Sequence, residues 1–380
     1  MPGASKSGTR ALVVAAALIA GAATAAPSQA VPRTHTPEAV VVASGLHNPR
    51  DVRIQPDGSL LIAEAGSGPA TPCTQPGARC FGFSGSLYRV KGHAQGRVVT
   101  GLPSELGVRA DGSTAVNGAV QAEYAGHGTY LVLYGLNGVP ANRVALGPGA
   151  EVFGTLSTSG GKVLGDLAEH ELRHDPDSVD GNNLVFSNPD QFVRDGRDFL
   201  VTDAAANDLI RVHPDGTTTT EFVFPDNVAQ APSPALTPAT PAGQLHAVPT
   251  GIVRGRDGAF YIADLSGMQQ GKSRIWRYVP GSRPTVLATG LTDITDLAPD
   301  PHGDDLIALS YGTRSGAPPA ESGPGALTRI DTRTGARTTI DTGDRLYQAC
   351  GLAVSRNGDV YVTDNTLSTS GELVKFPAQR

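Results

Sequence analysis

Acidic side chains stand at the ends of four similar apolar runs. Glu64 follows LLIA, Asp203 follows FLVT, and Asp264 and Asp364 follow FYIA and VYVT. Carboxylate and amide oxygens are the ligands that calcium and other hard cations prefer. We therefore predict a polar binding site of ten residues, in which Glu64, Asn188 and Asp264 are the candidate metal ligands. The other members are His47, Asn48, Asp203, His246, Asp293, Gln348 and Asp364.

The same acids also have a purely structural interpretation. Asp and Asn side chains often accept hydrogen bonds from the amides of their own turns, and an acid that recurs in several repeats favours that role. His47, Glu64 and Asn188 interrupt the repetition, which makes them the stronger candidates for binding. Tyr134 and Leu309 occupy the equivalent positions of two repeats, so a ring of ligands would be incomplete.

A second candidate for metal chemistry is the string from His170 to His174, which spells H-E-x-x-H. On a helix this spacing places two His on one face, as in zinc peptidases. Pro176 limits the helix to about two turns, and the following DPDSVDG does not supply an extended third-ligand pattern. A solvated polar helix is the favoured interpretation, with a zinc site as its alternative.

Two of the three cysteines, Cys73 and Cys80, lie in one loop rich in Pro and Gly and are close enough to form a disulfide in an oxidising compartment. Cys350 stands beside an apolar run. We interpret it as a small buried hydrophobe in preference to a nucleophile, because no His follows at a telling spacing.

The elements that position these residues are repeated strands. The segment 251–266, GIVRGRDGAFYIADLS, recurs with the same layout at 51–66 and 351–366. Later runs such as DLIRV and RIWRY predict third strands, and runs such as TTTTEFVF predict fourth strands. Four short strands per repeat are typical of a propeller blade. Six units follow from the turn glycines Gly58, Gly128, Gly196, Gly258, Gly303 and Gly358.

The sequence therefore predicts an all-β chain folded as a six-bladed β-propeller over residues 40–380. The segment 40–46 resembles the outer strand at 286–291, yet no blade precedes it. We expect it to pair with ELVKF at 372–376 and close the last blade, which removes an open sheet edge. A helix is predicted at 166–174, and the Pro-rich segment 229–244 is predicted to be a surface loop.

The first 30 residues have the features of a secretory signal peptide, and residues 31–39 are expected to form a linker. Lys6 and Arg10 precede an apolar run, and Ser28-Gln29-Ala30 is a plausible cleavage site. Removal of these two positive charges changes the formal net charge from −6 to −8. We expect a secreted monomer that binds no nucleic acid and inserts into no membrane, because basic runs and a long apolar span are missing from the sequence.

Several strings together resemble the exported ScyD/ScyE family: VVASGLHNPRDV, PDGSLLIAEAG, the loop of Cys73 and Cys80, VPTGIV, ATGLTDITDLA and GLAV. The resemblance covers nearly the whole mature chain and implies a six-bladed propeller related to NHL repeats and gluconolactonase-like enzymes, which hold a metal at the channel mouth. It brings no settled activity. The chain departs from the family at VFSNPDQFV, where Ser187, Asn188 and Pro189 are retained.

Four functions fit these features. The leading hypothesis is an exported binding or assembly module whose polar channel mouth meets a small molecule or a protein. The alternative is a metal-dependent lactonase-like hydrolase, which requires one bound divalent ion. A quinone-dependent sugar dehydrogenase would need basic and His residues, whereas the predicted site is acidic. A structural cell-surface protein would have an occluded channel.

Overall fold

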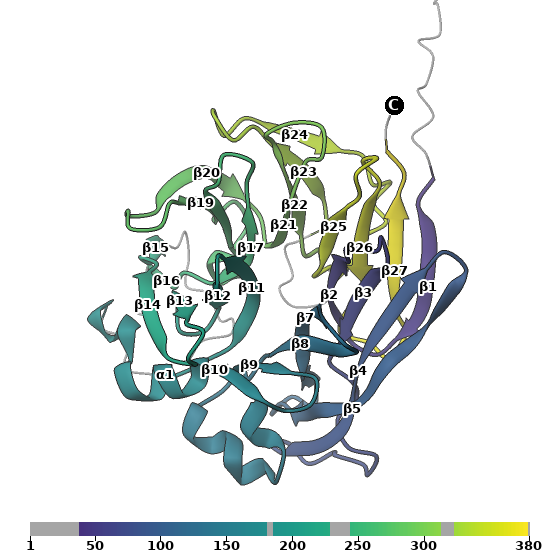
Figure 1. The fold of residues 1–380 in the computed structure, drawn as a ribbon, viewed down its shortest axis with the longest axis vertical. Coiled ribbons are helices and arrows are strands. Elements are labelled where there is room, and N and C mark those ends of the chain that lie inside the picture. Colours follow the sequence, from purple (N-terminus) through teal and green to yellow (C-terminus); the bar gives the residue numbers. More distant parts are fainter. Residues whose placement is uncertain (1–37, 181–184, 229–243, 313–322, 379–380) are drawn as a thin grey trace, which may run out of the picture. The chain divides into compact units, whose positions relative to one another are not determined.

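The computed structural model describes residues 38–180, 185–228, 244–312 and 323–378. The predicted signal peptide and most of the predicted Pro-rich loop lie outside these ranges. Six small sheets of antiparallel strands surround a common axis (Figure 1). The prediction of an all-β, six-bladed propeller is confirmed.

Each blade follows the predicted order of four strands, and blade one carries a fifth. Blade one is β2 (Pro49–Ile54), β3 (Leu60–Glu64), β4 (Arg79–Lys91), β5 (Ala94–Val108) and β6 (Thr114–Asn117); blade two is β7 (Ala119–Gly126), β8 (Thr129–Tyr134), β9 (Thr155–Thr158) and β10 (Val163–Asp166); blade three is β11 (Pro189–Asp195), β12 (Asp198–Asp203), β13 (Asp208–Val212) and β14 (Thr218–Val223).

The remaining blades are built alike. Blade four is β17 (Pro249–Arg254), β18 (Phe260–Asp264), β19 (Ser273–Tyr278) and β20 (Thr285–Leu291); blade five is β21 (Ile294–Pro299), β22 (Leu306–Ser310), β23 (Leu327–Ile330) and β24 (Arg337–Ile340); blade six is β25 (Leu352–Val354), β26 (Val360–Asp364), β27 (Gly371–Phe376) and β1 (Val40–Leu46). A two-stranded ribbon, β15 (Asn227–Val228) and β16 (Gln244–Leu245), connects blades three and four.

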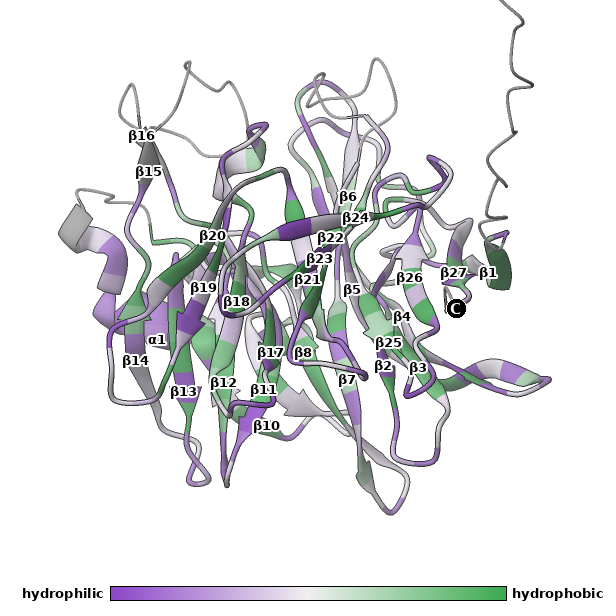
Figure 2. Cartoon of the chain, turned by 90° about the horizontal axis from the view of Figure 1, so that it is seen from above, coloured by the Kyte–Doolittle hydropathy of each residue, from purple (hydrophilic) through white to green (hydrophobic). Residues whose placement is uncertain are grey.

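The second strands form as predicted because apolar residues fill both faces of the sheet. Every residue of β3 and β18 is buried. At the preceding turns Gly58 and Gly258 adopt positive φ, which glycine tolerates without a steric penalty. The core lies between neighbouring blades, where Trp276 packs against Phe222 and Phe224. Figure 2 shows apolar strand surfaces in the interior and polar connecting loops at both ends of the strands.

The predicted closure of the ring is confirmed. β1 pairs with β27 in antiparallel register, with Val41 opposite Val374. The backbone N–H of Asn48 also donates to the carbonyl of Ser368, so the start of the first blade is tied to the last. Strands from the two ends of the propeller thus complete one sheet (Figure 1).

The helical segments are peripheral. The predicted helix is α1 (Leu167–His174), and the Asp166 carboxylate caps it by accepting the N–H of Glu169. Four 3-10 helices were not predicted, since one turn carries too little periodicity to detect: η1 (Pro140–Leu146), η2 (Ala150–Val152), η3 (Pro176–Asp180) and η4 (Ser266–Met268). Among the described residues, none of the helices is long and apolar enough to cross a membrane.

The favoured prediction that α1 is a solvated polar helix is wrong, because His170 and Glu171 are buried. His170 contacts blade three, where its ring nitrogens lie 3.0 Å and 2.7 Å from the hydroxyls of Thr218 and Thr220. Burial, together with His174, lowers the pKa of His170 to about 4. Both ring nitrogens already have hydrogen-bond partners, and we find no zinc arrangement with Glu171 in the part of the chain described.

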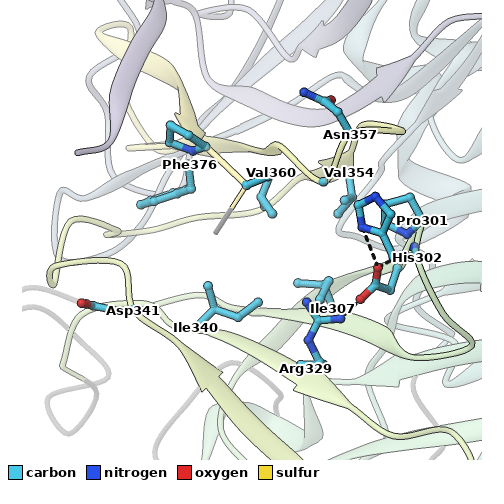
Figure 3. A pocket seen from close by; sticks show the side chains of 14 residues that line it. Pro301, His302, Ile307, Arg329, Ile340, Asp341, Val354, Asn357, Val360 and Phe376 are labelled. Atoms are coloured by element: carbon cyan, nitrogen blue, oxygen red, sulfur yellow. Dashed lines mark hydrogen bonds and ion pairs between the residues drawn. The ribbon is translucent and has the colours of Figure 1, made fainter. Parts of the chain in front are cut away.

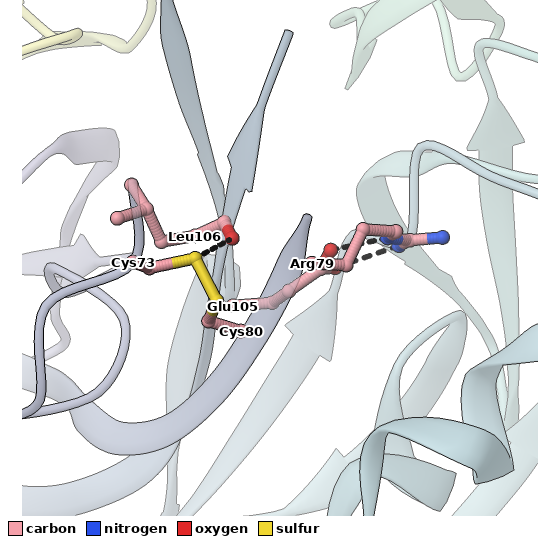
Figure 4. The surroundings of a disulfide bond; sticks show 5 residues. All are labelled: Cys73, Arg79, Cys80, Glu105 and Leu106. Atoms are coloured by element: carbon pink, nitrogen blue, oxygen red, sulfur yellow. Dashed lines mark hydrogen bonds and ion pairs between the residues drawn. A yellow bond between two sulfur atoms is a disulfide. The ribbon is translucent and has the colours of Figure 1, made fainter. Parts of the chain in front are cut away.

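The predicted disulfide between Cys73 and Cys80 is present, with Cα atoms 6.0 Å apart (Figure 4). Its Cys73 sulfur lies 3.7 Å from the carbonyl oxygen of Leu106 on β5. Beside it, the Arg79 guanidinium makes two hydrogen bonds to the buried Glu105 carboxylate. The disulfide ties the loop of residues 65–78 to β4, and the ion pair joins β4 to β5 within the long hairpin of blade one.

Candidate functional site at the channel mouth

The channel mouth consists of the residues at the starts of the six first strands, which contact one another in a closed circle around the axis. Antiparallel pairing brings the end of each second strand to the same level. Pro49 is opposite Glu64, Pro189 opposite Asp203, and Pro249 opposite Asp264. The acids predicted as a site therefore do lie beside the first-strand starts, each in its own blade.

Glu64 is completely buried, and donors of blade one surround its carboxylate. Arg97 donates to both oxygens at 2.7 Å and 2.8 Å, and the N–H of His47 donates to Oε1 at 2.7 Å. The Ser86 hydroxyl donates to Oε2. Glu64 thus makes the same kind of contact as the repeated aspartates, although its residue type differs.

Asp264 is equally occupied in blade four. Its Oδ2 accepts from Arg274 at 2.8 Å and from the Trp276 indole at 3.2 Å. Its Oδ1 accepts the N–H of Val248 at 3.0 Å and both donors of Ser266. These bonds join the start of the first strand to the second and third strands of the blade.

The two remaining acids repeat this arrangement. Asp203 accepts the N–H of Asn188 and the hydroxyl of Ser187, while Asp364 accepts the N–H of Tyr347 and a guanidinium N–H of Arg345. We call Glu64, Asp203, Asp264 and Asp364 the bracket acids. Their bonds support the structural interpretation, and the calcium ligands Glu64, Asn188 and Asp264 stay a prediction.

The other predicted residues occupy connections between strands. Asn48, Asp293 and Gln348 have left-handed backbones with φ of 48°, 49° and 55° in equivalent turns before the first strands. The Asn188 side chain links blades two and three, since its Oδ1 accepts the N–H groups of Leu136 and Asn137. His246 stands apart at the β15–β16 ribbon, where its Nδ1 lies 3.1 Å from an Asp226 oxygen.

One residue at an equivalent position in, or directly before, each first strand belongs to a set that we call the inner ring: Asp51, Gln121, Gln191, Gly251, Asp296 and Gly351. Members with long side chains bind the backbone of the next blade. The Gln121 amide bonds Phe192 in both directions, Gln191 accepts the N–H of Ile252, and Asp296 accepts the N–H of Leu352.

Arg53 links blade one to blade three at this level. Its guanidinium donates to Asp51 at 2.6 Å and to the Gln191 side chain of blade three at 2.9 Å. Burial raises the pKa of Asp51 despite Arg53, and burial together with the Asp51 charge raises the pKa of Asp296 well above its usual value. Both shifts favour the protonated form of these two carboxyls. The inner ring forms a hydrogen-bonded floor under the mouth.

Arg50, Asp190 and Cys350 each precede a member of the inner ring by one residue, and they are close enough to influence one another's pKa. Asp190 is half-buried, and no donor of the described chain is hydrogen-bonded to its carboxylate. Burial and then Asp51 raise its pKa to about 7, although Arg50 opposes the shift. Asp190 can therefore donate or accept a proton near neutral pH.

Its two neighbours are a cation and a neutral thiol. Arg50 donates to the carbonyl of Val116 at 2.7 Å. The sulfur of the half-buried Cys350 is 3.1 Å from the Thr366 hydroxyl, and burial raises the pKa of its thiol. A raised pKa disfavours the thiolate, which agrees with our interpretation that Cys350 is no nucleophile.

Sequence reasoning missed Asp190 although one signal was present. Three first strands open with proline, and the residue that follows is Arg50 in blade one, Asp190 in blade three and Thr250 in blade four. The difference between copies was visible at this position. Only the fold shows that these three positions meet near one axis.

A cavity of about 320 Å³ lies elsewhere, between blades five and six (Figure 3). Ile307, Ile340 and Phe376 form its apolar walls, and Arg329 is paired with Asp300 at one side. Its lining comes from the first-to-second strand turns and from strands β22 to β27. None of the predicted site residues belongs to it.

Comparisons with known proteins give similarity only in fold. No protein-family model and no curated protein match the chain. Among solved structures, a catalytically inactive virginiamycin B lyase from Staphylococcus aureus with quinupristin is 11% identical, with a TM-score of 0.47 over 89% of this chain and 97% of that chain. A putative gluconolactonase is 9% identical, with a TM-score of 0.42 over 90% and 94%. Regucalcin from Agrobacterium tumefaciens, a calcium-binding protein, is 11% identical, with a TM-score of 0.44 over 88% and 94%.

Proposed function

We propose that this chain is an exported β-propeller of the ScyD/ScyE type that binds a small polar molecule at its channel mouth. The observation that carries the proposal is Asp190. The bracket acids have hydrogen-bond donors from their own blades, whereas no donor of the described chain occupies the Asp190 carboxylate. A half-buried carboxyl without such a donor is suited to meet a ligand.

The neighbours of Asp190 define the chemistry of that ligand. Arg50 supplies a positive charge and N–H donors, and Asp190 exchanges a proton near pH 7. A hydroxyl, carboxylic acid or carboxamide group would hydrogen-bond both side chains. The inner ring beneath them limits the site to the mouth, so we expect a small ligand or one end of a larger one.

Export is supported by two independent features of the chain. The first 30 residues have a basic start, an apolar run and a small-residue cleavage site. The Cys73–Cys80 disulfide suits an oxidising compartment outside the cytoplasm. Expression of the full chain should place the protein in the medium, and N-terminal sequencing should begin at Val31. Cell-retained protein that still begins at Met1 would contradict this part.

Ligand binding is tested by calorimetry with three probes of defined chemistry: a phenol, a hydroxy acid and glucono-δ-lactone. We expect heat of binding from at least one probe, a dependence on pH between 6 and 8, and loss of the heat in Asp190→Asn and Arg50→Ala. Asp215→Asn is the matched control, because Asp215 is an exposed acid of the same blade. If all three probes bind the Asp190→Asn protein as well as the parent, the mouth is not the site.

The alternative function, a metal-dependent hydrolase, is tested in the same samples by measuring hydrolysis of the lactone. It requires Glu64, Asn188 and Asp264 to turn toward an ion, yet the oxygens of all three accept hydrogen bonds within the propeller. Hydrolysis of the lactone that exceeds its spontaneous rate and depends on a divalent cation would support the hydrolase and contradict the binding module.

A further inference from the structure

A cluster of carboxylates that the mouth does not use lies on the outer side of blade three. It combines Glu171 of α1, Asp175 directly after that helix, Asp177 of η3 and Asp208 at the start of β13. We call these four residues the outer acid cluster. Figure 1 shows α1 beside β14, away from the central axis.

Two members of the outer acid cluster are buried, and no positive charge of the described chain offsets the loss of water around their carboxylates. Glu171 and Asp208 are both 0% exposed, and neither carboxylate meets a hydrogen-bond donor at bonding distance. The Phe186 amide approaches Glu171 and partly offsets its burial. Leaving two carboxylates in this state is costly, because each charge loses its hydration and gains no counter-charge. A purely structural role like that of the bracket acids, whose carboxylates are hydrogen-bonded within their blades, does not explain these two residues.

The oxygens are close enough to share one ion. Glu171, Asp175 and Asp177 each offer a carboxylate oxygen, and these three oxygens lie within 4.8 Å of one another. Calcium takes oxygen ligands at 2.3–2.6 Å, so two ligands of one ion are separated by at most about 5 Å. The Asn207 amide, which donates to Asp177 at 2.7 Å, helps to hold that ligand in place.

Burial and mutual repulsion of these carboxylates favour the binding of a cation. Burial, then Asp203, Asp177 and Asp175, raise the pKa of Glu171 to about 9. Burial, then Asp203 and Glu171, raise the pKa of Asp208 well above its usual value, and every cause of this shift raises it. A divalent ion would reverse these shifts, since it stabilises the charged form of each carboxylate.

We propose that Glu171, Asp175 and Asp177 bind one calcium ion, with Asp208 as a fourth carboxylate beside it. The all-oxygen ligand set favours calcium over softer metals such as zinc. The ion would fasten α1 and η3 to the β12–β13 turn of blade three. None of these four residues is among the ten site residues predicted from the sequence, although the bracket acid Asp203 is opposite Asp208 in the β12–β13 pair.

The test is thermal unfolding of the full chain after treatment with a chelator, with CaCl₂ or MgCl₂ added back at pH 7.5. Calcium at roughly 100 times its Kd should raise the Tm by about 3–6 °C. Calorimetry should give one ion per chain, with weaker binding at pH 5.5 because protons compete for the carboxylates. A wild-type Tm that does not change with calcium overturns the proposal.

Variants separate this site from the mouth. Glu171→Gln should lose the calcium shift, yet in chelator at pH 7.5 it should unfold no earlier than the wild type, because the amide is uncharged like the protonated carboxyl that a pKa of about 9 favours. Asp175→Asn serves if Glu171→Gln fails to fold. Asn188→Ala, at the mouth, should keep the full shift. A shift that survives in Glu171→Gln and Asp175→Asn, or disappears in Asn188→Ala, contradicts the site.

Discussion

Carboxylates near the axis of this propeller behave in two ways, and the difference depends on their donors. Asp264 accepts from an arginine, an indole and three donors of Val248 and Ser266, so its charge is compensated where it is buried. Asp190 has no such set, and Asp51 is close to it. One residue type is therefore structural in blade four and titratable in blade three.

The first prediction concerns the stability contribution of Asp190. Its folded pKa of about 7 lies above the ordinary value of 3.8, so the folded protein prefers the protonated form. Such a group favours folding below about pH 4 and loses that contribution as the pH rises to 7. Asparagine mimics the protonated form. Asp190→Asn should therefore raise the free energy of unfolding at pH 8 by about 1–3 kcal/mol and leave it nearly unchanged at pH 4.

Urea unfolding of both proteins across this pH range measures the effect. The quantity of interest is the difference between variant and wild type, since other groups titrate equally in both. A difference that stays constant from pH 4 to pH 8 would show that Asp190 has an ordinary pKa.

At the scale of the element, the blade is a unit held by its bracket acid. The acid ends the second strand, binds the backbone just before the first strand and, in blades one, four and six, accepts from an arginine. The repetition of these acids in the sequence reflects this shared mechanical role. Each one accepts a backbone N–H that lies just before the first strand of its blade.

We expect Asp264→Ala to destabilise the protein strongly. The change leaves Arg274, which is 8% exposed, without its carboxylate and leaves the Trp276 indole without an acceptor. Loss of a buried partner of this kind costs about 3–5 kcal/mol. Asp257→Ala in the same blade is the control, because its Arg277 pair is solvent-exposed and contributes about 1 kcal/mol or less. Equal losses in chemical denaturation would argue against the bracket role.

A second element-level prediction concerns the glycines of the inner ring. A Cβ atom on Gly351 would lie 2.5 Å from the Arg50 carbonyl oxygen and 2.6 Å from the Cα of Asp51. Both atoms belong to the backbone of blade one and cannot move aside independently. Gly351→Ala should thus cost about 2 kcal/mol or more through overpacking.

Gly303→Ala is the matched control for this change. Gly303 has no positive φ, and its nearest neighbour would be 3.9 Å from the added atom. We expect a stability change within about 0.5 kcal/mol, measured in the same unfolding experiment. If Gly351→Ala is as mild as the control, the first strands are not packed as closely as the structure indicates.

At the scale of the whole molecule, the ring is closed by one strand from the other end of the propeller. β1 covers β27, which would otherwise present unpaired backbone groups to solvent. An open edge of this kind is a template for pairing with other chains. The closing strand thus protects the propeller against association as well as stabilising blade six.

A pair of truncations tests this closure. A chain that begins at Glu38 keeps β1 and should behave as the mature protein does. A chain that begins at His47 lacks β1, and we expect a lower Tm, a less cooperative transition and aggregates in size-exclusion chromatography. A monodisperse, equally stable product from the shorter chain would show that β1 is dispensable.

Local sequence patterns were sufficient to predict the architecture. Turn glycines such as Gly58 and Gly258, the apolar runs between them and the spare strand at 40–46 are local signals, and blade count and closure follow from local periodicity. The disulfide and the helix at 167–174 were also predictable, because their residues are neighbours in the chain.

The tertiary structure alone decided what each polar residue does. Glu64 looked exceptional until Arg97, 33 residues later, was seen to bind it. Asp190 and Arg50 come from different blades, and the ligand atoms close to Glu171 are carboxylate oxygens of Asp175 and Asp177, not histidine nitrogens. These pairings depend on how blades and connections pack, and burial sets the pKa values only after packing is complete. Local sequence patterns carry no information about such distant partners.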